Sequence, residues 1–502
     1  MTPTPHPIES GELLSLSQMA RTCPEALKRL RLSAAYPFAG NILPDGCLAP
    51  NFMYFGQTGS GKTLELRMLL RNVLGARPWD GRVRPRCRIV IFDAKGEDLM
   101  PSVLGWCPPE YLIDLHAYSE SGIALHLGKS CVTPEDGQEL AHMMIEDSKK
   151  SHDFFTPAAQ QLLEAIVHTL QLRGGDWFLY DLLIACGDES LLRHVLQLHP
   201  RGKSLLREYL RKGVEASQNM LQTLNVKLGP WRLASLLERR AEHYITVDGW
   251  LNSGGVIVLR GSSRNSKTIE AWNSFVFRLL VARLRDRAEN YPVDETFLFV
   301  DETPESILAS YREALLLGRI KGVRTAATIQ DPGGLIARFG GREQASEAVG
   351  QIGNLCVGRL ASPDAAEWLS GFFGKHVFWQ EKRTDTKSPQ GRSTTIGHEL
   401  REDHNVYPYE FQDFPQASLG NGYEVVARAP MVGAWRKKVD GKFIKQMLGE
   451  QPPNENVRRR RKLTKEDIGY TWGAADYARL KIPPPSSGGE KKMRDGGVRL
   501  PW

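Results

Sequence analysis

Long apolar runs are missing from this 502-residue sequence. No stretch of about 18 apolar residues occurs, so the sequence predicts no membrane-spanning helix. The first residues, MTPTPHPIESGELL, also lack the basic and apolar regions of a secretory signal peptide. These two absences lead us to expect a cytoplasmic protein.

Cysteine is sparse and unpatterned, and no internal repeat is visible. The seven cysteines are odd in number, and none forms a C-x-x-C pair. Disulfide frameworks and zinc sites use paired cysteines at regular spacings. We therefore expect buried free thiols in a reducing compartment.

Net charge is modest and concentrated at one end of the chain. The formal charge is +7, and the segment from Gln451 onward holds 12 Lys and Arg against 6 Asp and Glu. That segment is rich in proline, glycine and charge, a composition that cannot form a core, so we expect 450–502 to be a disordered tail. A basic tail suits an anionic partner such as nucleic acid, although a merely solvated tail has the same composition.

The stretch GQTGSGKT (56–63) follows the pattern G-x-x-x-x-G-K-[ST]. An apolar strand precedes it (51–55) and an amphipathic helix follows it (64–74), so free N–H groups at the helix start would point at an anion. The pattern predicts a phosphate-binding loop in which Lys62 reaches the β- and γ-phosphates of ATP and the Thr63 hydroxyl ligates Mg²⁺. The expected cofactor-binding residues are Gly56, Thr58, Gly59, Ser60, Gly61, Lys62 and Thr63.

Strand and helix patterns alternate around this loop, and further along the chain a helical stretch lies between two groups of strands. Apolar strands are expected within 88–98, where the strand ends in a polar loop, and at 110–115, 255–261, 296–302, 324–330, 354–360 and 423–430. Helical periodicity dominates 150–240. A polar stretch at 380–397 is expected to be an exposed loop or β-ribbon. The predicted class is α/β, with a mostly parallel sheet and an inserted all-α domain. The expected divisions are 1–48, 49–149 and 241–449 (two parts of the nucleotide-binding domain), 150–240, and 450–502.

The strand TFLFVDE ends in two carboxylates. Asp301 is expected to hold Mg²⁺, and Glu302 to act as the general base on the attacking water. Gln330 ends another apolar strand, where it is a candidate γ-phosphate sensor or a plain turn residue. Arg319 and Arg324 are each either a surface residue or a cation acting on a neighbouring subunit's nucleotide.

The order GQTGSGKT, IVIFDAKGED, DFFTPAAQQLLEAIV, VIVLRG, FLFVDE and GRIKGVRTAATIQ resembles the type IV secretion coupling proteins of the TraD/TraG kind. These are RecA-like P-loop motors related to the FtsK and HerA translocases. The resemblance covers roughly 50–430, and it rests on the combination of segments rather than on any single motif. The sequence departs from the family at 1–48, which holds none of the transmembrane helices that members usually carry.

The resemblance implies a hexameric ring that hydrolyses ATP with Mg²⁺ and translocates DNA without reading its sequence. It makes Arg319 the trans-acting cation, Asp301 the Mg²⁺ ligand, Glu302 the base and Gln330 the sensor. It gives no firm role to the loop of Asp93, Lys95 and Glu97. It also implies a relaxase, secretion components and a separate membrane partner that would recruit the chain to the inner membrane.

Two other functions remain open on the sequence. The chain could be an ATPase platform that recruits and remodels protein substrates, or a soluble DNA translocase of a mobile-element or defence locus. A regulatory module with an idle site fits less well, since an idle site needs no base beside Asp301. DNA-stimulated hydrolysis separates a DNA motor from the others.

Overall fold

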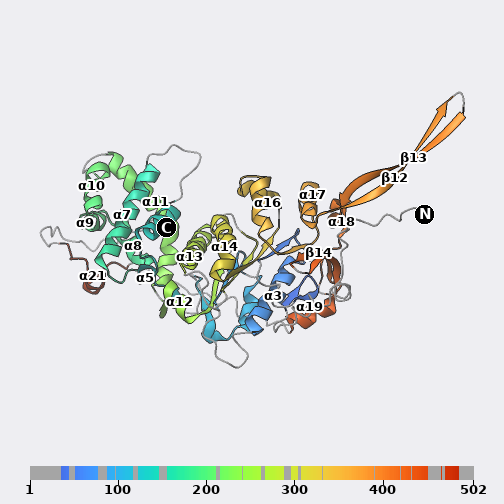
Figure 1. The fold of residues 1–502 in the computed structure, drawn as a ribbon. Helices are drawn as coiled ribbons and strands as arrows, with labels where there is room; N and C mark the ends of the chain where they lie inside the picture. The colour runs from blue at the N-terminus through green and yellow to red at the C-terminus, as the bar shows by residue number, and fades with distance from the viewer. Residues whose placement is uncertain are drawn as a thin grey trace. The chain divides into compact units, whose positions relative to one another are not determined.

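The computed structural model describes residues 36–43, 51–76, 88–96, 98–116, 123–145, 155–210, 215–239, 241–261, 266–287, 296–303, 307–330, 332–388, 391–418, 420–430, 432–449, 465 and 470–485. The chain forms two compact units (Figure 1). The first unit comprises Met1–Arg84, Pro101–Trp106 and Glu289–Pro452. The second comprises Pro85–Met100, Cys107–Ala288 and Pro453–Trp502.

The sheet of the first unit is mostly parallel. Its strands follow the order β15-β14-β11-β3-β10-β9, with β3, β9, β10 and β11 parallel and β14 and β15 antiparallel. The runs FMYF and TFLFVD are buried at every position, as expected for strands covered on both faces. The strands are β3 (Phe52–Phe55), β9 (Thr296–Asp301), β10 (Val323–Ile329), β11 (Asn354–Val357), β14 (Tyr423–Ala429) and β15 (Gly433–Val439).

Helices pack around this sheet. α3 (Lys62–Ala76) lies against β3, β9 and β10 and beside α19 (Gly441–Leu448), while α14 (Leu308–Lys321) packs on β10. The remaining helices are α4 (Met100–Trp106), α15 (Pro332–Arg338), α16 (Arg342–Gly350), α17 (Pro363–Ser370), η4 (Gly371–Phe373) and α18 (Pro408–Asp413).

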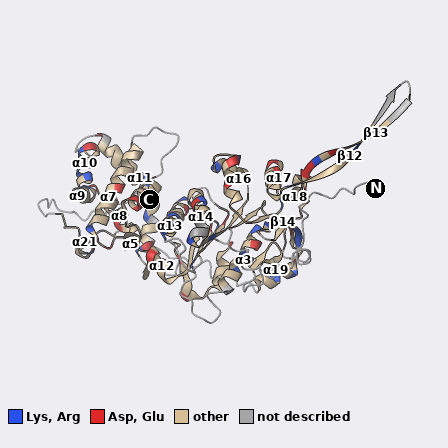
Figure 2. Ribbon diagram, viewed as in Figure 1, with Lys and Arg blue, Asp and Glu red and all other residues tan. Residues whose placement is uncertain are grey.

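A two-stranded ribbon extends from the first unit (Figure 1). It consists of β12 (Lys375–Ser388) and β13 (Gly391–His404), so the polar stretch that the sequence left as loop or ribbon is a ribbon. Trp379 faces Leu400 across the strands, and both are about half exposed. Acidic and basic side chains mix along the base of the ribbon (Figure 2).

The second unit joins a small parallel sheet to a cluster of helices. The sheet has the order β4-β8-β5, and β6 pairs with β7. Helices α7 to α11 fall within the stretch whose periodicity predicted helix. The elements are β4 (Arg88–Asp93), η2 (Pro109–Tyr111), β5 (Leu112–Asp114), β6 (Ile123–Leu125), α5 (Leu127–Ser130), α6 (Pro134–Met144), α7 (Phe155–Arg173), α8 (Leu179–Gly187), α9 (Glu189–Leu196), α10 (Pro200–Tyr209), α11 (Glu215–Glu238), β7 (His243–Ile245), α12 (Val247–Ser253), β8 (Gly255–Arg260), α13 (Ser266–Arg285) and α21 (Ala474–Leu480).

Two expectations from composition can be compared with the described part of the chain. No helix there is long and apolar enough to cross a membrane. The cysteines found there, which are Cys107, Cys131, Cys186 and Cys356, are buried free thiols.

Part of the expected tail is ordered. Residues 470–485 form α21 and its flanks, and Trp472, Leu480 and Ile482 are buried, at 8%, 1% and 2% exposure. This differs from the expected disorder because three apolar anchors in 16 residues suffice to hold the segment against a preformed surface. Of the remainder of 450–502, only 465 is described.

A buried carboxylate joins α3 to its surroundings. Glu65 on α3 accepts hydrogen bonds from the Tyr423 hydroxyl on β14 and, at 2.9 Å, from the Ala39 N–H. Ala39 connects β1 (Tyr36–Phe38) to β2 (Asn41–Leu43), so three distant segments meet at one side chain. Burial raises the pKa of Glu65 to about 7, although both hydrogen bonds oppose the rise.

We predict that Glu65→Gln removes part of the pH dependence of stability. A pKa that is higher in the folded than in the unfolded chain favours folding below about pH 4.5, and this contribution is lost as pH rises through about 7. The shift corresponds to about 3 kcal/mol. Urea unfolding between pH 4.5 and 8 should show a smaller loss of stability in Glu65→Gln than in the wild type, and the exposed control Glu343→Gln should match the wild type. If the free energy of unfolding changed with pH to the same extent in the wild type and both variants, the raised pKa of Glu65 would be contradicted.

Candidate active site

The phosphate-binding loop lies between β3 and α3, as the sequence predicts. Gly56, Gly59 and Gly61 have φ of 153°, 76° and 95°. A Cβ on Gly61 would lie 2.7 Å from the ring of Tyr423, and one on Gly56 would lie 2.4 Å from the Ser60 hydroxyl. The loop therefore needs glycine for both backbone conformation and space.

Neighbouring strands hold the loop in place through its backbone. The Gly56 N–H donates to the Ile329 carbonyl at the end of β10, and the Gln57 N–H donates to the Arg359 carbonyl after β11, at 3.2 and 2.8 Å. On the other side the Gly59 carbonyl accepts from the Ala417 N–H at 2.7 Å. The cradle is thus fixed before any ligand arrives, which limits the entropy lost on binding.

The polar side chains of the loop fit a phosphate group and a hard cation. Lys62 is buried at 8% exposure and its ammonium donates to the Gln57 carbonyl at 2.9 Å, within its own loop. The Ser60 hydroxyl is buried and has no hydrogen-bond partner within the described residues. The Thr63 hydroxyl lies 3.4 Å from the Asp301 carboxylate, which gives two oxygen ligands of the kind that Mg²⁺ prefers. We conclude that these residues fit a nucleoside triphosphate with Mg²⁺.

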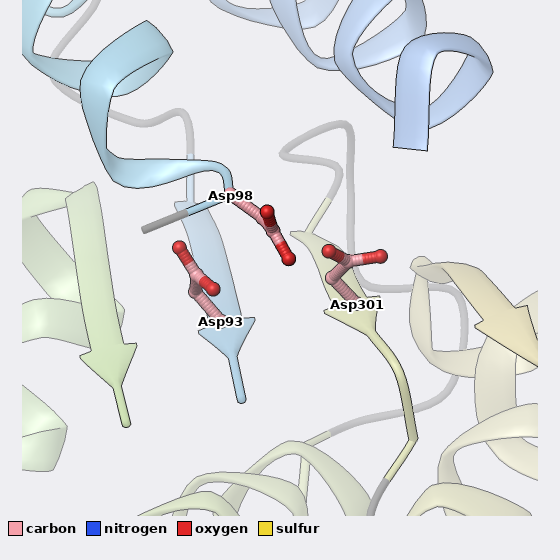
Figure 3. Close-up of side chains that lie close together, drawn as sticks. All are labelled: Asp93, Asp98 and Asp301. Carbon is pink, nitrogen blue, oxygen red and sulfur yellow. The ribbon is translucent and has the colours of Figure 1, made fainter. Parts of the chain in front are cut away.

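Asp301 is the last residue of β9 (Figure 3) and is buried, at 1% exposure, and Glu302 follows it directly. Glu302 has φ of 50°, a left-handed conformation that costs a non-glycine residue about 1–3 kcal/mol. This conformation turns the chain sharply directly after the strand. Such strain persists only where neighbouring groups fix the backbone.

Thr328 on β10 is the neighbour that fixes it. Its hydroxyl donates to the Asp301 carboxylate at 2.7 Å and accepts from the Glu302 N–H, also at 2.7 Å. Its carbonyl accepts from the Thr303 N–H at 3.3 Å. One buried threonine therefore orients the carboxylate and supports the strained turn. Sequence analysis did not identify Thr328, because a threonine inside an apolar strand does not by itself indicate a functional role. Its role becomes visible only in the structure, where it lies beside β9, the strand that ends in Asp301.

Gln330 lies at the end of the same strand. Its amide donates to the Thr58 hydroxyl of the loop at 2.8 Å. A surface pocket is lined by Gln57 and Thr58 of the loop, by Gln330, and by 360–362 between β11 and α17. The structure thus brings Gln330 to the phosphate-binding loop, as its place at a strand end leads one to expect.

Arg319 lies in α14, but its side chain falls outside the described residues, so its predicted role stays a prediction. Arg324 lies on β10, where its guanidinium is 5.7 Å from the ring centre of Phe297. That contact is with a side chain of the same sheet.

The loop after β4 in the second unit has a structural role. Asp93 is fully buried (Figure 3), and its carboxylate accepts the N–H groups of Gly96, Leu99 and Met100 at 2.9, 2.9 and 3.1 Å. Burial raises its pKa, and these hydrogen bonds oppose the rise. Lys95 is exposed and lies 3.6 Å from Asp98, while Glu97 falls outside the described residues. Asp93 therefore closes its own loop.

Comparison with known proteins identifies relatives of the whole arrangement. The family model described as type IV secretion-system coupling protein DNA-binding domain matches residues 36–428. Similar solved structures include the plasmid coupling protein TrwB in complex with ADP and Mg²⁺, at 18% identity and a TM-score of 0.62 over 91% of this chain and 97% of that one. No curated protein matches the sequence.

Two further solved structures have a similar fold. TrwB in complex with a non-hydrolysable ATP analogue has 19% identity and a TM-score of 0.62, over 88% of this chain and 95% of that one. The unbound bacterial conjugative coupling protein TrwBdeltaN70 has 19% identity and a TM-score of 0.59, over 84% and 91%. At these identities the likeness establishes the fold, a RecA-like α/β architecture.

We predict that Thr328→Val destabilises the acid-bearing turn although it keeps the shape of the side chain. The Asp301 carboxylate and the Glu302 N–H each lose a partner, which costs about 1–3 kcal/mol of the free energy of unfolding. Thr328→Ser keeps the hydroxyl and is the matched control. Denaturant unfolding measures the cost, and calorimetric titration of nucleotide with and without Mg²⁺ should show a weaker Mg²⁺ effect in the valine variant only. A valine variant equal to wild type in both measurements would contradict the role.

Proposed function

This chain belongs to the family of type IV secretion-system coupling proteins, and we propose that it is an ATP-hydrolysing motor that moves DNA during conjugative transfer. The proposal rests on the short distance between the phosphate-binding loop and the acid pair. Thr63 of the loop and Thr328 of β10 both contact the Asp301 carboxylate, at 3.4 and 2.7 Å. Such an arrangement serves phosphoryl transfer, in which a protein positions groups and stabilises charge.

Each residue has a defined task in this proposal. The loop N–H groups and Lys62 bind the phosphates; Lys62 exchanges its bond to the Gln57 carbonyl for phosphate oxygens. Thr63 and Asp301 hold Mg²⁺, which neutralises charge on the phosphates when bound. Glu302, directed by its left-handed backbone, takes the proton of the attacking water.

Gln330 is proposed to sense the γ-phosphate. Its amide already donates a hydrogen bond to Thr58, so nucleotide binding at the loop and movement of the end of β10 affect each other in this proposal. The TrwB complexes with ADP and Mg²⁺ and with an ATP analogue support ATP and Mg²⁺ as the ligands here.

The partners follow from the family. Its model is that of a DNA-binding domain, which supports DNA as the substrate. We propose further that the motor is a homo-oligomeric ring, with a hexamer as the expected form, and that a relaxase and secretion components meet it. Recruitment to the inner membrane would then depend on a separate partner.

DNA-stimulated hydrolysis tests the function. We expect ATP turnover to rise with added DNA of unrelated sequences and to fall as salt increases, because phosphate contacts release counterions. Lys62→Ala should lose hydrolysis and weaken ATP binding, whereas Glu302→Gln should bind ATP with Mg²⁺ and turn it over at least 100-fold more slowly. Turnover and filter binding of labelled ATP measure the two effects.

Three outcomes would contradict the proposal in different ways. Hydrolysis that DNA leaves unchanged would favour a platform for protein substrates. Near-normal turnover by Glu302→Gln would mean that another group is the base. Unchanged ATP binding by Lys62→Ala would place the phosphates elsewhere.

Arg319 is proposed to act on the nucleotide of a neighbouring subunit, where such a cation contributes roughly 10³–10⁵ in turnover. Arg319→Ala should bind ATP normally and hydrolyse it slowly. Turnover per subunit should fall on dilution, and mixing Arg319→Ala with Lys62→Ala subunits should restore some activity because each supplies what the other lacks. Arg324→Ala is the matched control and should retain turnover. A flat dilution curve with no rescue would rule out action between subunits.

A further inference from the structure

The ordered segment 470–485 lies against the helices of the second unit, outside the part of the chain that the family model matches. The site it contacts is the α7–α8 turn, residues 174–181, defined here as the docking turn. Trp472, Leu480 and Ile482 are the buried apolar residues of the segment. Figure 1 shows α21 beside the helices of this unit.

A buried acid at the centre of the docking turn is neutralised by the segment. Asp181 is fully buried, and one of its carboxylate oxygens accepts the Phe178 N–H at 2.9 Å as a helix cap. Arg479 of the segment forms two parallel bonds to the same carboxylate, at 2.7 and 2.8 Å. The indole of Trp472 donates to it at 3.1 Å. Burial raises the pKa of Asp181, and the Arg479 guanidinium opposes the rise.

A second buried acid lies at the same end of α8. Glu238 at the end of α11 accepts the Leu179 N–H at 3.1 Å through one oxygen. Its other oxygen has no hydrogen-bond partner among the described residues. Burial raises the pKa of Glu238 well above its usual value, and the negative charge of Asp181 adds to the rise. Arg479 pairs with Asp181, so it is the Asp181 carboxylate that makes the docking turn selective for a cationic side chain.

The docking turn is also shaped for close approach of another backbone. A Cβ on Gly175 would lie 2.7 Å from the Arg479 carbonyl oxygen and 2.8 Å from the Leu480 Cα. The turn therefore has glycine where the segment passes. The ring of Tyr470 packs under the Arg239 guanidinium at 3.4 Å.

Hydrogen bonds within the segment stabilise its conformation. Asp476 caps α21 by accepting the Gly473 N–H at 2.9 Å and the Tyr470 hydroxyl at 2.6 Å. No strand pairing joins the segment to the helices in the described structure. Twenty residues, 450–469, connect it to Gly449 in the first unit, and a chain of that length can extend to about 70 Å. The segment is therefore a short helical ligand on a long connection.

We propose that the docking turn is an exchangeable peptide-binding site that takes residues 470–485 of a second copy of the chain as well as its own. The site recognises a short segment with an aromatic residue, an arginine and aliphatic residues in the pattern Trp-x6-Arg-Leu-x-Ile. Because the connection is long, the same contacts form within one chain or between two.

Exchange is tested on the full chain carrying a protease site within 450–469, cut after folding. A fluorescent peptide of residues 469–486 should replace the released segment in a saturable way. The Arg479→Ala peptide should bind on the order of 100-fold more weakly, because it leaves the buried Asp181 carboxylate without its cation. The Lys481→Ala peptide removes a cation of the same segment from an exposed bond to the Gly174 carbonyl, and should bind almost as well as the wild type.

Exchange between intact copies is tested with two complementary variants. Gly175→Ala should block the docking turn, leaving its own segment sensitive to limited proteolysis, while Arg479→Ala leaves the turn free and its segment undocked. Mixing the two should restore protection of the Gly175→Ala segment. Gly187→Ala, whose Cβ meets nothing within 4 Å, is the control for the glycine change and should keep its own segment protected.

Three results would overturn the proposal. The cut segment could stay bound without exchanging, which would make it an integral part of the unit. The labelled peptide could bind the cut wild type and the cut Gly175→Ala chain equally. Mixing could fail to restore protection although both variants keep the wild-type circular dichroism spectrum. None of these results depends on ATP hydrolysis, so the motor function is tested separately.

Discussion

A carboxylate removed from water must be hydrogen-bonded, paired with a cation or protonated, and the fold of this protein depends on how four of them are satisfied. Asp301 joins β9 to β10 and to the phosphate-binding loop. Glu65 joins α3 to β14 and to the β1–β2 hairpin. Asp181 receives the C-terminal segment, and Asp93 closes its own loop. Except at Asp93, the partners are far apart in the sequence, so these carboxylates determine which segments meet.

The sequence could predict what is encoded locally. The loop at 56–63 depends on glycines and a lysine at fixed spacing, and the acid pair at 301–302 follows a recognisable apolar strand. Runs such as TFLFVD and VRTAATI read as strands because every position except Asp301 and Arg324 is apolar or β-branched. The α/β class with a mostly parallel sheet followed from these patterns together with the resemblance to a family, whereas the order of strands in the sheet comes from the structure alone.

What the sequence could not predict depends on distant partners. Glu65 looks like a solvent-facing helix residue until Tyr423, 358 positions later, is placed against it. Gly61 belongs to the motif, but the ring that demands a glycine there is that same Tyr423. The pair of Asp181 and Arg479 spans 298 positions, and a charged tail with prolines reads as disorder when that partner is unknown. Hydrogen bonds and ion pairs between buried polar groups that are far apart in the chain leave no periodic pattern in the sequence.

The end of β10 shows how such pairings link binding to chemistry. Thr328 contacts the acid pair, and Gln330, two positions later, contacts Thr58 of the loop, while the Ile329 carbonyl between them accepts the Gly56 N–H. Three consecutive residues of one strand therefore touch the residues that would hold Mg²⁺, the base and the phosphates. A displacement of this strand end changes all three contacts at once. Because Thr328 supports the left-handed turn at Glu302, we expect a displacement of this strand end to shift Glu302, the residue proposed as the base.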